Sequence, residues 1–567
     1  MGSHPKRPLH LFGRSRFAGL VVLLLVLSGI GPALAQPGLN PASVEALVFP
    51  GESIVIDKTV HTPEFPPQPD IMFLADTTGS MGPAIANVKA NATAIMNQIA
   101  AVQPQAQFGA AEYRDFNCSD PFAYRLNQAL TSSIATAQAG INQWITGNGC
   151  DIPEAQLNAL FRLATEPVGF RPDPATRIIV WFGDANGHNP SGGHSLPAVI
   201  SALQARDIMV IAVPVITPAG NGLNNGGQAS AITTATGGQL LPAASSDQVA
   251  AAILSGLSNL PVNVSMASDC AAPISTSFDP ASRVVTSGDD ADFTETISVA
   301  AGAAGGTYQC SDWALLNGEP MVDDAGNIIY ETKTIHVPGI ELTPELETNE
   351  LGTPGQTHTV TATITAGDFG PVAGVRVEFE ILSGPNAGET GEGTTDAAGQ
   401  VEFTYVATQG PAGLGLDLIE ARFTDGDDTV VYGSDTATKD WVDTTPPDCD
   451  CLEGPNPSSN VPSAPGQGGQ GQNQDGFYEL VASDAVWPDA DLDIFVVDSG
   501  SGTIFGPFAV GTVVKYTQVP GGNPDIKPGT GEVDWKIKGT GDMQVFAVDG
   551  SGNASTPVDC LVPPPPQ

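Results

Sequence analysis

The spacing of hydrophobic residues changes near residue 261, and this change divides the chain into two kinds of structure. Between residues 70 and 260, short apolar runs alternate with longer segments in which apolar residues recur every three or four positions. The apolar runs are "IMFLA", "QFGAAEY", "RIIVWFG" and "IMVIAVPV". Near-continuous apolar strands are buried on both faces, and the periodic segments are typical of amphipathic helices. The pattern therefore predicts an α/β domain with a doubly wound, Rossmann-like parallel sheet.

Beyond residue 261, apolar and polar residues alternate and Gly, Thr, Asp and Pro become frequent. In "VRVEFEI", for example, Val375, Val377 and Phe379 point to one face of a strand. This spacing favours antiparallel β sandwiches, so the expected fold class is a multidomain chain with an α/β domain followed by all-β sandwiches. The expected divisions are a signal peptide at 1–35, a β segment at 36–69, the α/β domain at 70–260, a first β module at 261–337, a second at 338–445, a Pro, Gly and Gln linker at 446–475, a third module at 476–560 and a tail at 561–567.

The segment at 36–69 does not belong obviously to the α/β domain. It contains "SIVIDKTVHTP", which echoes "IIYETKTIHVP" at 328–338. One explanation is coincidence between two β-rich segments. The alternative is that the N-terminal segment supplies a strand to the first sandwich, which would make the α/β domain an insertion in that sandwich.

The first 35 residues have a basic start, an apolar middle and a small-residue end at "ALAQ". These features are typical of a secretory signal peptide that is cut after Ala35, so the protein is expected to be secreted and no membrane span is predicted. The formal net charge of −41 disfavours nucleic acid and anionic membranes as partners. It suits a solvated acidic surface or the binding of divalent cations.

Seven cysteines in an exported chain are expected to form disulfides, with one left over. We expect Cys270 to pair with Cys310, and Cys560 to pair with either Cys449 or Cys451. A bridge between Cys118 and Cys150 is a further hypothesis, because it would tether two loops that carry candidate ligands.

The segment "DTTGSM" at 76–81 follows the apolar run "IMFLA" and places Asp76, Thr78 and Ser80 at alternate positions. The carboxyl ends of parallel strands are where α/β sheets hold ligands. One carboxylate and two hydroxyls make up half of the oxygen shell that Mg²⁺ prefers, and Ca²⁺ or Mn²⁺ would fit less strictly. The alternative is a polar turn that caps a helix.

This stretch resembles the metal-ion-dependent adhesion site of von Willebrand factor A domains, whose pattern is D-x-S-x-S after the first strand. The resemblance implies an Asp after a later strand, which "RIIVWFGDANGH" supplies as Asp184. It also implies a Thr from another loop, for which Thr146 is the nearby candidate.

The segment "CDIPEAQLNAL" resembles the D-x-P-E segment of the I-like domain in integrin β subunits. That resemblance implies Glu154 as a ligand of the same metal. It also implies a neighbouring second cation held by Asp115, Asp151 and the carbonyl of Pro153. The integrin subtype has an Asn where this chain has Gly149, which puts the second cation in doubt.

Residues 338–445 resemble bacterial immunoglobulin-like domains of the invasin and intimin type, through "HTVTATITAGDFGPVAGVRVEFEILSGPNAG" and "TTDAAGQVEFTYVATQGPAG". Such modules serve as spacers, and the chain has no nucleophile elbow, zinc-protease motif or phosphate loop, so no enzymatic activity is expected. We expect a secreted bacterial adhesion protein whose bound Mg²⁺ (or Ca²⁺ or Mn²⁺) takes a carboxylate from a partner protein or cell surface. The alternative is a structural component of an extracellular matrix or surface layer, in which the metal only stabilises the fold.

Overall fold

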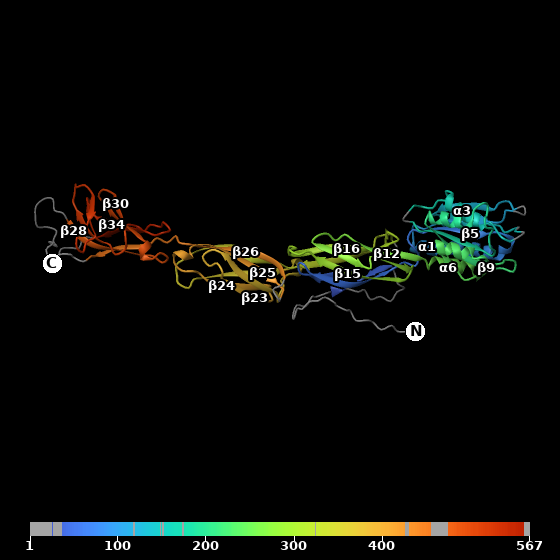
Figure 1. Ribbon diagram of the computed structural model, residues 1–567, viewed down its shortest axis with the longest axis horizontal. Helices are drawn as coiled ribbons and strands as arrows, with labels where there is room; N and C mark the ends of the chain where they lie inside the picture. Colours follow the sequence, from blue (N-terminus) through green and yellow to red (C-terminus); the bar gives the residue numbers. More distant parts are fainter. Residues whose placement is uncertain are drawn as a thin grey trace. The chain divides into compact units, whose positions relative to one another are not determined.

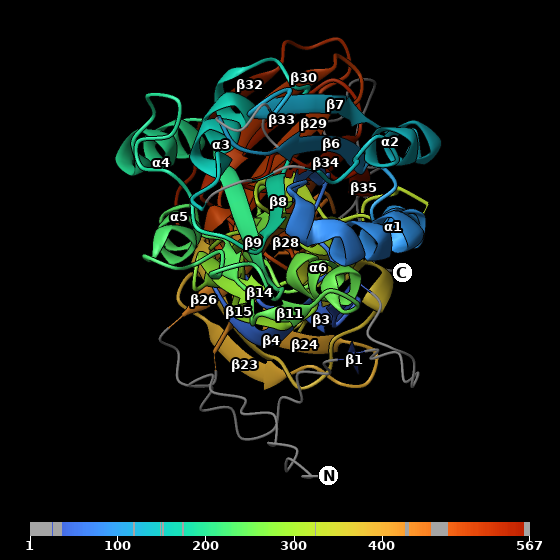
Figure 2. The same cartoon turned by 90° about the vertical axis from the view of Figure 1, so that its right-hand side faces the viewer.

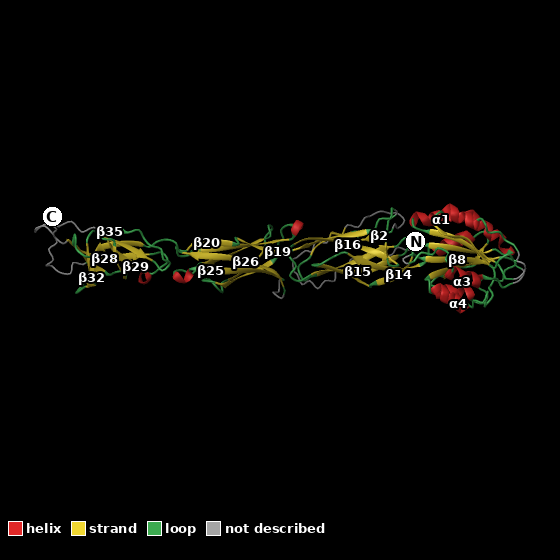
Figure 3. Ribbon diagram, turned by 90° about the horizontal axis from the view of Figure 1, so that it is seen from above, coloured by secondary structure: helices red, strands yellow, loops and turns green. Residues whose placement is uncertain are grey.

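The computed structural model describes residues 25–26, 37–116, 120–147, 149, 152–172, 175–323, 325–425, 430–454 and 474–560. The chain forms two compact units that divide between Val337 and Pro338. Strands account for 47% of the structure and helices for 16%. The described part of the chain is therefore mostly β, and its α-helices lie in one region; the short red segments elsewhere in Figure 3 are 3₁₀ turns.

The expected fold class, a Rossmann-like α/β domain followed by immunoglobulin-like sandwiches, is wrong. The chain has a mostly β fold with only six α-helices in its described part, all of them between Gly82 and Leu257. Strands from both sides of this helical region share one sandwich, so the helices interrupt a β structure and do not precede it. Local spacing of apolar residues predicts strands and helices, but it does not reveal which strands pair across 200 residues.

The first sandwich consists of two sheets whose strand orders are β1-β3-β18-β16-β12-β14, with β17 paired to β16, and β13-β15-β4-β2. Their bounds are β1 (Leu25–Val26), β2 (Gly38–Asn40), β3 (Ser43–Leu47), β4 (Ser53–His61), β12 (Pro261–Ser268), β13 (Ile274–Asp279), β14 (Ser282–Thr286), β15 (Asp290–Val299), β16 (Gly306–Leu316), β17 (Glu319–Pro320) and β18 (Tyr330–Val337).

N-terminal strands complete both sheets of this sandwich. Strand β4 pairs antiparallel with β15, and β3 pairs parallel with β18. Figure 1 shows the blue N-terminal strands among the green ones that follow the helical region. Of the two explanations for the echoed segments, the pairing agrees with the second, because "SIVIDKTVHTP" forms β4 and "IIYETKTIHVP" contains β18.

The helical region is built on a sheet with the strand order β10-β9-β8-β5-β6-β7, and β11 also pairs with β9. All pairs are parallel except β6 with β7. The strands are β5 (Asp70–Asp76), β6 (Gln107–Tyr113), β7 (Tyr124–Thr131), β8 (Arg177–Gly183), β9 (Ile208–Ile216), β10 (Gln239–Leu240) and β11 (Ala244–Ser245). The helices are α1 (Gly82–Val102), α2 (Ile134–Ile141), α3 (Gln156–Thr165), α4 (Leu196–Gln204), α5 (Gln228–Ala235) and α6 (Val249–Leu257).

Helices cover both faces of this sheet, with α3, α4 and α5 on one side and α1 and α6 on the other (Figure 2). Successive residues of a strand point to opposite faces. In β5, Phe73 packs with α1 and α6, whereas Met72 and Leu74 pack with α3 and α4. Burial on both faces explains why β5 is apolar from Ile71 to Ala75, between Asp70 and Asp76 at its two ends.

The second unit contains two further β regions. The first has sheets of order β19-β21-β24 and β20-β26-β25-β22-β23, and the second has sheets of order β27-β28-β31-β33-β32 and β30-β29-β34-β35. The strands of the first are β19 (Gly339–Thr343), β20 (Leu346–Glu350), β21 (Thr357–Thr365), β22 (Arg376–Ser383), β23 (Thr390–Thr394), β24 (Gln400–Val406), β25 (Gly415–Thr424) and β26 (Val431–Val442). Those of the second are β27 (Asp448–Glu453), β28 (Gln474–Ser483), β29 (Asp493–Asp498), β30 (Thr503–Phe508), β31 (Val513–Gln518), β32 (Asp525–Pro528), β33 (Trp535–Gly539), β34 (Met543–Val548) and β35 (Val558–Cys560). Strand β27 lies inside the stretch that was expected to be a linker.

Two disulfides are present in the described part of the chain. The predicted Cys270–Cys310 bond is confirmed, and Cys560 pairs with Cys451, which leaves Cys449 as a free thiol. The hypothetical Cys118–Cys150 bridge lies outside the described residues. Disulfides are typical of proteins that fold in an oxidising compartment.

The predicted signal peptide also lies outside the described residues, except for Leu25 and Val26 of β1. Within the described residues, none of the helices has the length and apolar character needed to cross a membrane.

Candidate metal site

Two neighbouring strands bring acidic residues to one edge of the helical region's sheet. Asp76 is the last residue of β5, and Asp184 directly follows β8. The strands are parallel, with Ala75 opposite Phe182, so the two carboxylates emerge side by side. Asp76 and Asp184 are 0% and 1% exposed. Two of the predicted ligands therefore form a pair of buried carboxylates at the carboxyl end of the sheet.

The turn after β5 folds the predicted hydroxyl ligands toward Asp76. The Thr78 amide and hydroxyl both donate to Asp76 Oδ1, at 2.9 and 2.7 Å. Thr78 Oγ1 lies 3.5 Å from Ser80 Oγ. The turn does not cap a helix through its side chains. Thr78 precedes the 3₁₀ turn η1 (Gly79–Met81) and Met81 precedes α1, and neither side chain accepts a capping hydrogen bond.

Backbone hydrogen bonds hold Glu154 against the loop that follows β8. The Glu154 amide donates to the carbonyl of Asn186 at 2.9 Å, and the His188 amide donates to the carbonyl of Glu154 at 2.9 Å. Glu154 is 4% exposed. The segment that carries Glu154 is thus fixed by the same loop that carries Asp184.

These side chains line one pocket of about 470 Å³. Its lining residues are Thr78, Gly79, Ser80, Gly149, Ile152, Glu154, Asp184, Ala185, Ala219 and Gly220. Asp76 is not a lining residue, but it accepts a hydrogen bond from the Thr78 hydroxyl, which belongs to one. The structure therefore brings together all five residues that the sequence predicted for the first cation.

The acidic groups of the pocket repel one another. Burial, and then the charge of Asp184, raise the pKa of Asp76 to about 7. Burial, followed by the charges of Asp76 and Asp115, raises the pKa of Glu154 to about 9. Among the described residues, no Lys or Arg forms an ion pair with Asp76, Glu154 or Asp184.

Two buried oxygen atoms of the pocket have no hydrogen-bond partner in the described part of the chain, Asp76 Oδ2 and Glu154 Oε2. Buried carboxylate oxygens without partners are costly, since each has lost water and gained nothing. A hard divalent cation would supply the missing partner and cancel the repulsion. Carboxylate and hydroxyl oxygens are the donor types that Mg²⁺, Ca²⁺ and Mn²⁺ take.

The residues predicted for a second cation are less well assembled. Asp115 Oδ1 accepts a hydrogen bond from the Phe116 amide at 2.7 Å and lies 3.0 Å from His188 Nε2. Pro153 adjoins Glu154, and Asp151 lies outside the described residues. Of this group, the described part of the chain contains Asp115 and Pro153, and Asp115 Oδ1 is already in contact with His188 and the Phe116 amide.

A threonine other than the expected Thr146 lies beside Asp184. Thr217 donates a hydrogen bond from Oγ1 to Asp184 Oδ2, and its Oγ1 accepts one from the Gly220 amide at 3.0 Å. Thr146 instead faces Gly82, where a Cβ would lie 3.6 Å from its hydroxyl. A signal was available, because Thr217 directly follows β9 at the same sheet edge that carries Asp76 and Asp184.

Gly149 explains how the loop before Glu154 comes so close to the turn. Its φ is +76°, and a Cβ at this position would lie 2.8 Å from Thr78 Cβ and 3.7 Å from Glu154 Oε1. Any side chain here would push against Thr78. The glycine that differs from the integrin pattern thus leaves room for the pocket.

Comparisons with known proteins add little to this geometry. No family model matches the chain. No curated protein matches it either. Among solved structures, the chain is similar to proximal thread matrix protein 1 from the mussel byssus, with 16% sequence identity and a TM-score of 0.29. The match covers 35% of this chain and 50% of the mussel protein, and likeness at this level carries no argument about fold or function.

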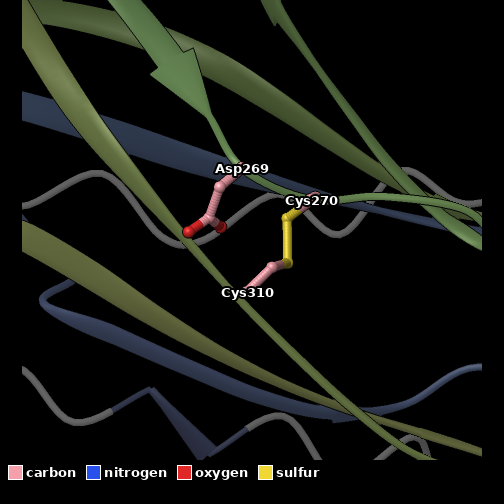
Figure 4. A group of neighbouring side chains, drawn as sticks. All are labelled: Asp269, Cys270 and Cys310. Atoms are coloured by element: carbon pink, nitrogen blue, oxygen red, sulfur yellow. A yellow bond between two sulfur atoms is a disulfide. The ribbon is translucent and has the colours of Figure 1, made fainter.

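Two other groups in the first sandwich have the composition of a metal site. Asp269, Cys270 and Cys310 lie together, but Figure 4 shows the two sulfurs bonded to each other, so no thiolate is available. The second group, Glu295, Asp312 and Glu331, is buried together with two lysines.

Proposed function

We propose that the pocket at the end of β5 binds a divalent cation and presents it to a carboxylate on a partner protein or cell surface. Asp76, Thr78, Ser80, Glu154 and Asp184 would hold the cation. The preferred ion is Mg²⁺, with Ca²⁺ or Mn²⁺ as alternatives. In this proposal the chain is a secreted adhesion protein and has no enzymatic activity.

The observation that carries the proposal is the pair of unpartnered oxygens, Asp76 Oδ2 and Glu154 Oε2, buried among like charges. A structural cluster of acids would be expected to contain donors for both atoms. Two hydroxyls of the site already donate to other carboxylate oxygens, since the Thr78 hydroxyl donates to Asp76 Oδ1 and the Thr217 hydroxyl donates to Asp184 Oδ2.

The surrounding residues support binding of a partner. When bound, the cation supplies an open coordination position for an incoming carboxylate. Thr217 orients Asp184, and the Asn186 carbonyl fixes the backbone at Glu154. Ile152 lines the same pocket and is 40% exposed, so it offers apolar contact to a partner at the rim. The resemblance of "DTTGSM" to metal-ion-dependent adhesion sites adds support from the sequence.

The first experiment is calorimetric titration of Mg²⁺, Ca²⁺ and Mn²⁺ into the full chain after treatment with EDTA. We expect one strong site in the wild type, which Asp76→Asn and Glu154→Gln abolish. Glu166→Gln is the matched control, because Glu166 is a partly exposed acid paired with Arg162 and is not among the lining residues of the pocket. Equal binding by the wild type and the Asp76→Asn variant would overturn the assignment.

The second experiment separates adhesion from structural stabilisation. Immobilised peptides that end in a free carboxylate are compared with the same peptides as amides, with Mg²⁺ or EDTA. Retention that requires both the metal and the free carboxylate supports adhesion. If EDTA lowers the melting temperature but no peptide is retained and association between chains is unchanged, the metal is structural.

A further inference from the structure

Five charged side chains are buried between the two sheets of the first sandwich, and we refer to them as the ionic layer. Each of their side chains is 0% exposed. They are Lys58 of β4, Glu295 of β15, Asp312 of β16, and Glu331 and Lys333 of β18. The two lysines occupy equivalent positions in the echoed segments "SIVIDKTVHTP" and "IIYETKTIHVP".

Apolar clusters close the layer on both sides. One contains Val60, Phe293 and Leu316, and the other contains Ile297 and Ile335. Along β15, residues 293, 295 and 297 point into the sandwich in turn, so Glu295 stands where the strand pattern calls for an apolar residue. The layer is therefore shielded from water.

Within the layer, Glu295 lies between the two lysines. Lys58 Nζ is 2.9 Å from Glu295 Oε2, and Lys333 Nζ is 3.0 Å from Glu295 Oε1. Lys58 Nζ also pairs with Glu331 Oε2, and Lys333 Nζ pairs with Asp312 Oδ2. The layer thus contains two amine–carboxyl pairs and one shared carboxyl.

Three acids and two lysines cannot all be ionised without a net buried charge. Burial lowers the pKa of Lys58 to about 8, and burial raises the pKa of Glu295. Neutral amine and neutral carboxylic acid are therefore accessible forms in this layer. A neutral amine held against a carboxyl carbon, away from water, is arranged for condensation, because proximity replaces the encounter of the two groups.

A metal ion is a weaker explanation for the same acids. Oxygens of Glu295, Asp312 and Glu331 lie within 4.8 Å of one another. However, the ammonium groups of Lys58 and Lys333 already contact these oxygens. A cation entering the layer would have to displace both lysines and bury three like-signed charges together.

We propose that Lys58 and Glu331 form an intramolecular amide bond across the sandwich. The Nζ of Lys58, as the neutral amine, attacks Cδ of Glu331, the Nζ–Cδ bond forms, and the bond from Cδ to one carboxyl oxygen breaks. One Nζ proton leaves with that oxygen and its own proton as a molecule of water. Glu295 receives the Nζ proton on one oxygen and returns a proton to the departing hydroxyl, so it ends unchanged. Nothing is oxidised or reduced.

The choice of this pair follows from charge and topology. An amide between Lys58 and Glu331 removes two charges. The Lys333–Asp312 ion pair then lies beside a protonated Glu295, so the layer as a whole has no net charge. Lys333 and Asp312, in contrast, lie on β18 and β16, which are already joined by hydrogen bonds. The Lys58–Glu331 bond joins the two sheets and encloses residues 59–330, including the helical region, in one covalent loop.

The test is the mass of the full-length protein after reduction and alkylation. We expect the measured mass of the wild type to be lower, by one water, than the mass calculated from its sequence. Proteolysis should release a branched peptide that contains both Lys58 and Glu331. Lys58→Arg and Glu331→Ala should have their full masses. Lys333→Arg should still lose one water. Glu331→Gln should reach the wild-type mass, because its amide loses ammonia in place of water.

Two results would overturn the proposal. One is a wild-type protein of full mass, which would make the layer an ionic network only; this result does not depend on any variant folding. The other is loss of water that persists in Lys58→Arg and disappears in Lys333→Arg, which would assign the bond to Lys333. Glu295→Gln should slow the mass change in freshly purified protein. Near-UV circular dichroism checks that each variant has folded.

Discussion

The candidate metal-site pocket and the ionic layer both bury three carboxylates, but in the described part of the chain only the layer contains cations of its own. Lys58 and Lys333 contact the acids of the layer, whereas no lysine or arginine of the described chain pairs with Asp76, Glu154 or Asp184. Buried charge must be compensated by something. In the layer the compensation is internal, and in the pocket we expect it to come from outside the chain.

Asp498 shows a third way to bury a carboxylate. Burial raises its pKa, but hydrogen bonds from Ser501, Thr540 and Gly541 outweigh burial and hold the pKa well below its usual range. The amides of Thr540 and Gly541 donate to it at 2.8 and 2.7 Å. Burial alone therefore does not decide whether a carboxylate is charged; the partners around it do.

The largest expected effect comes from removing a cation of the ionic layer. Lys333→Met leaves Glu295 and Asp312 without their shared partner, and breaking a buried ion pair in this way costs about 3–5 kcal/mol. Denaturant unfolding of the full chain measures the change. Lys527→Met is the control, because Lys527 is 66% exposed and paired with Asp525, where the change should stay within about 0.5 kcal/mol. Equal effects would show that the layer is not needed for stability.

Removing an acid of the pocket should have a different outcome. Glu154→Gln takes away one of three repelling carboxylates, so the EDTA-treated variant should be at least as stable as the wild type. Its affinity for Mg²⁺ should fall by more than about 100-fold, since even residues behind the ligands are worth about 10- to 100-fold. Thermal unfolding tests the predicted stability, and calorimetric titration tests the predicted loss of Mg²⁺ affinity. A large loss of stability without metal would place the pocket in the same class as the layer.

The pH dependence of stability provides the third test. Asp76 and Glu154 have pKa values of about 7 and about 9 in the folded chain, against roughly 4 when unfolded. Between about pH 4 and about pH 9 the metal-free folded state thus holds more protons than the unfolded state, and stability should fall as pH rises. Mg²⁺ should reduce this slope. Melting temperatures at pH 5 to 9, with EDTA or Mg²⁺, measure it, and identical slopes would contradict the assignment.

The smallest effect concerns the fit of the loop at Gly149. Gly149→Ala adds a Cβ 2.8 Å from Thr78 Cβ at a φ of +76°, and we expect the shift of Thr78 to weaken Mg²⁺ binding about tenfold, or about 1.4 kcal/mol. Gly226→Ala is the matched control, because its φ is +80° and no atom lies within 4 Å of the added Cβ. Backbone strain alone would affect both variants equally and leave Mg²⁺ affinity unchanged.

Much of the candidate site could be predicted from local sequence. Asp76 and Asp184 end apolar runs, and parallel strands bring such residues to one edge. Thr217 obeys the same rule, because it directly follows the apolar strand β9. The Cys270–Cys310 bond was also predictable, whereas Cys449 and Cys451 lie on the same face of β27, and only the tertiary structure shows which of them bonds to Cys560.

The sequence by itself determined where strands and helices occur and which acids end the strands, because these features depend on residues that are close in the chain. Only the tertiary structure decided that the helices interrupt a mostly β fold, because β4 finds β15 more than 200 residues later. It alone placed Lys58, Lys333 and three acids in one buried layer. A lysine at an apolar position of β4 is a local oddity in the sequence, and its meaning depends on partners that pairing between distant strands supplies.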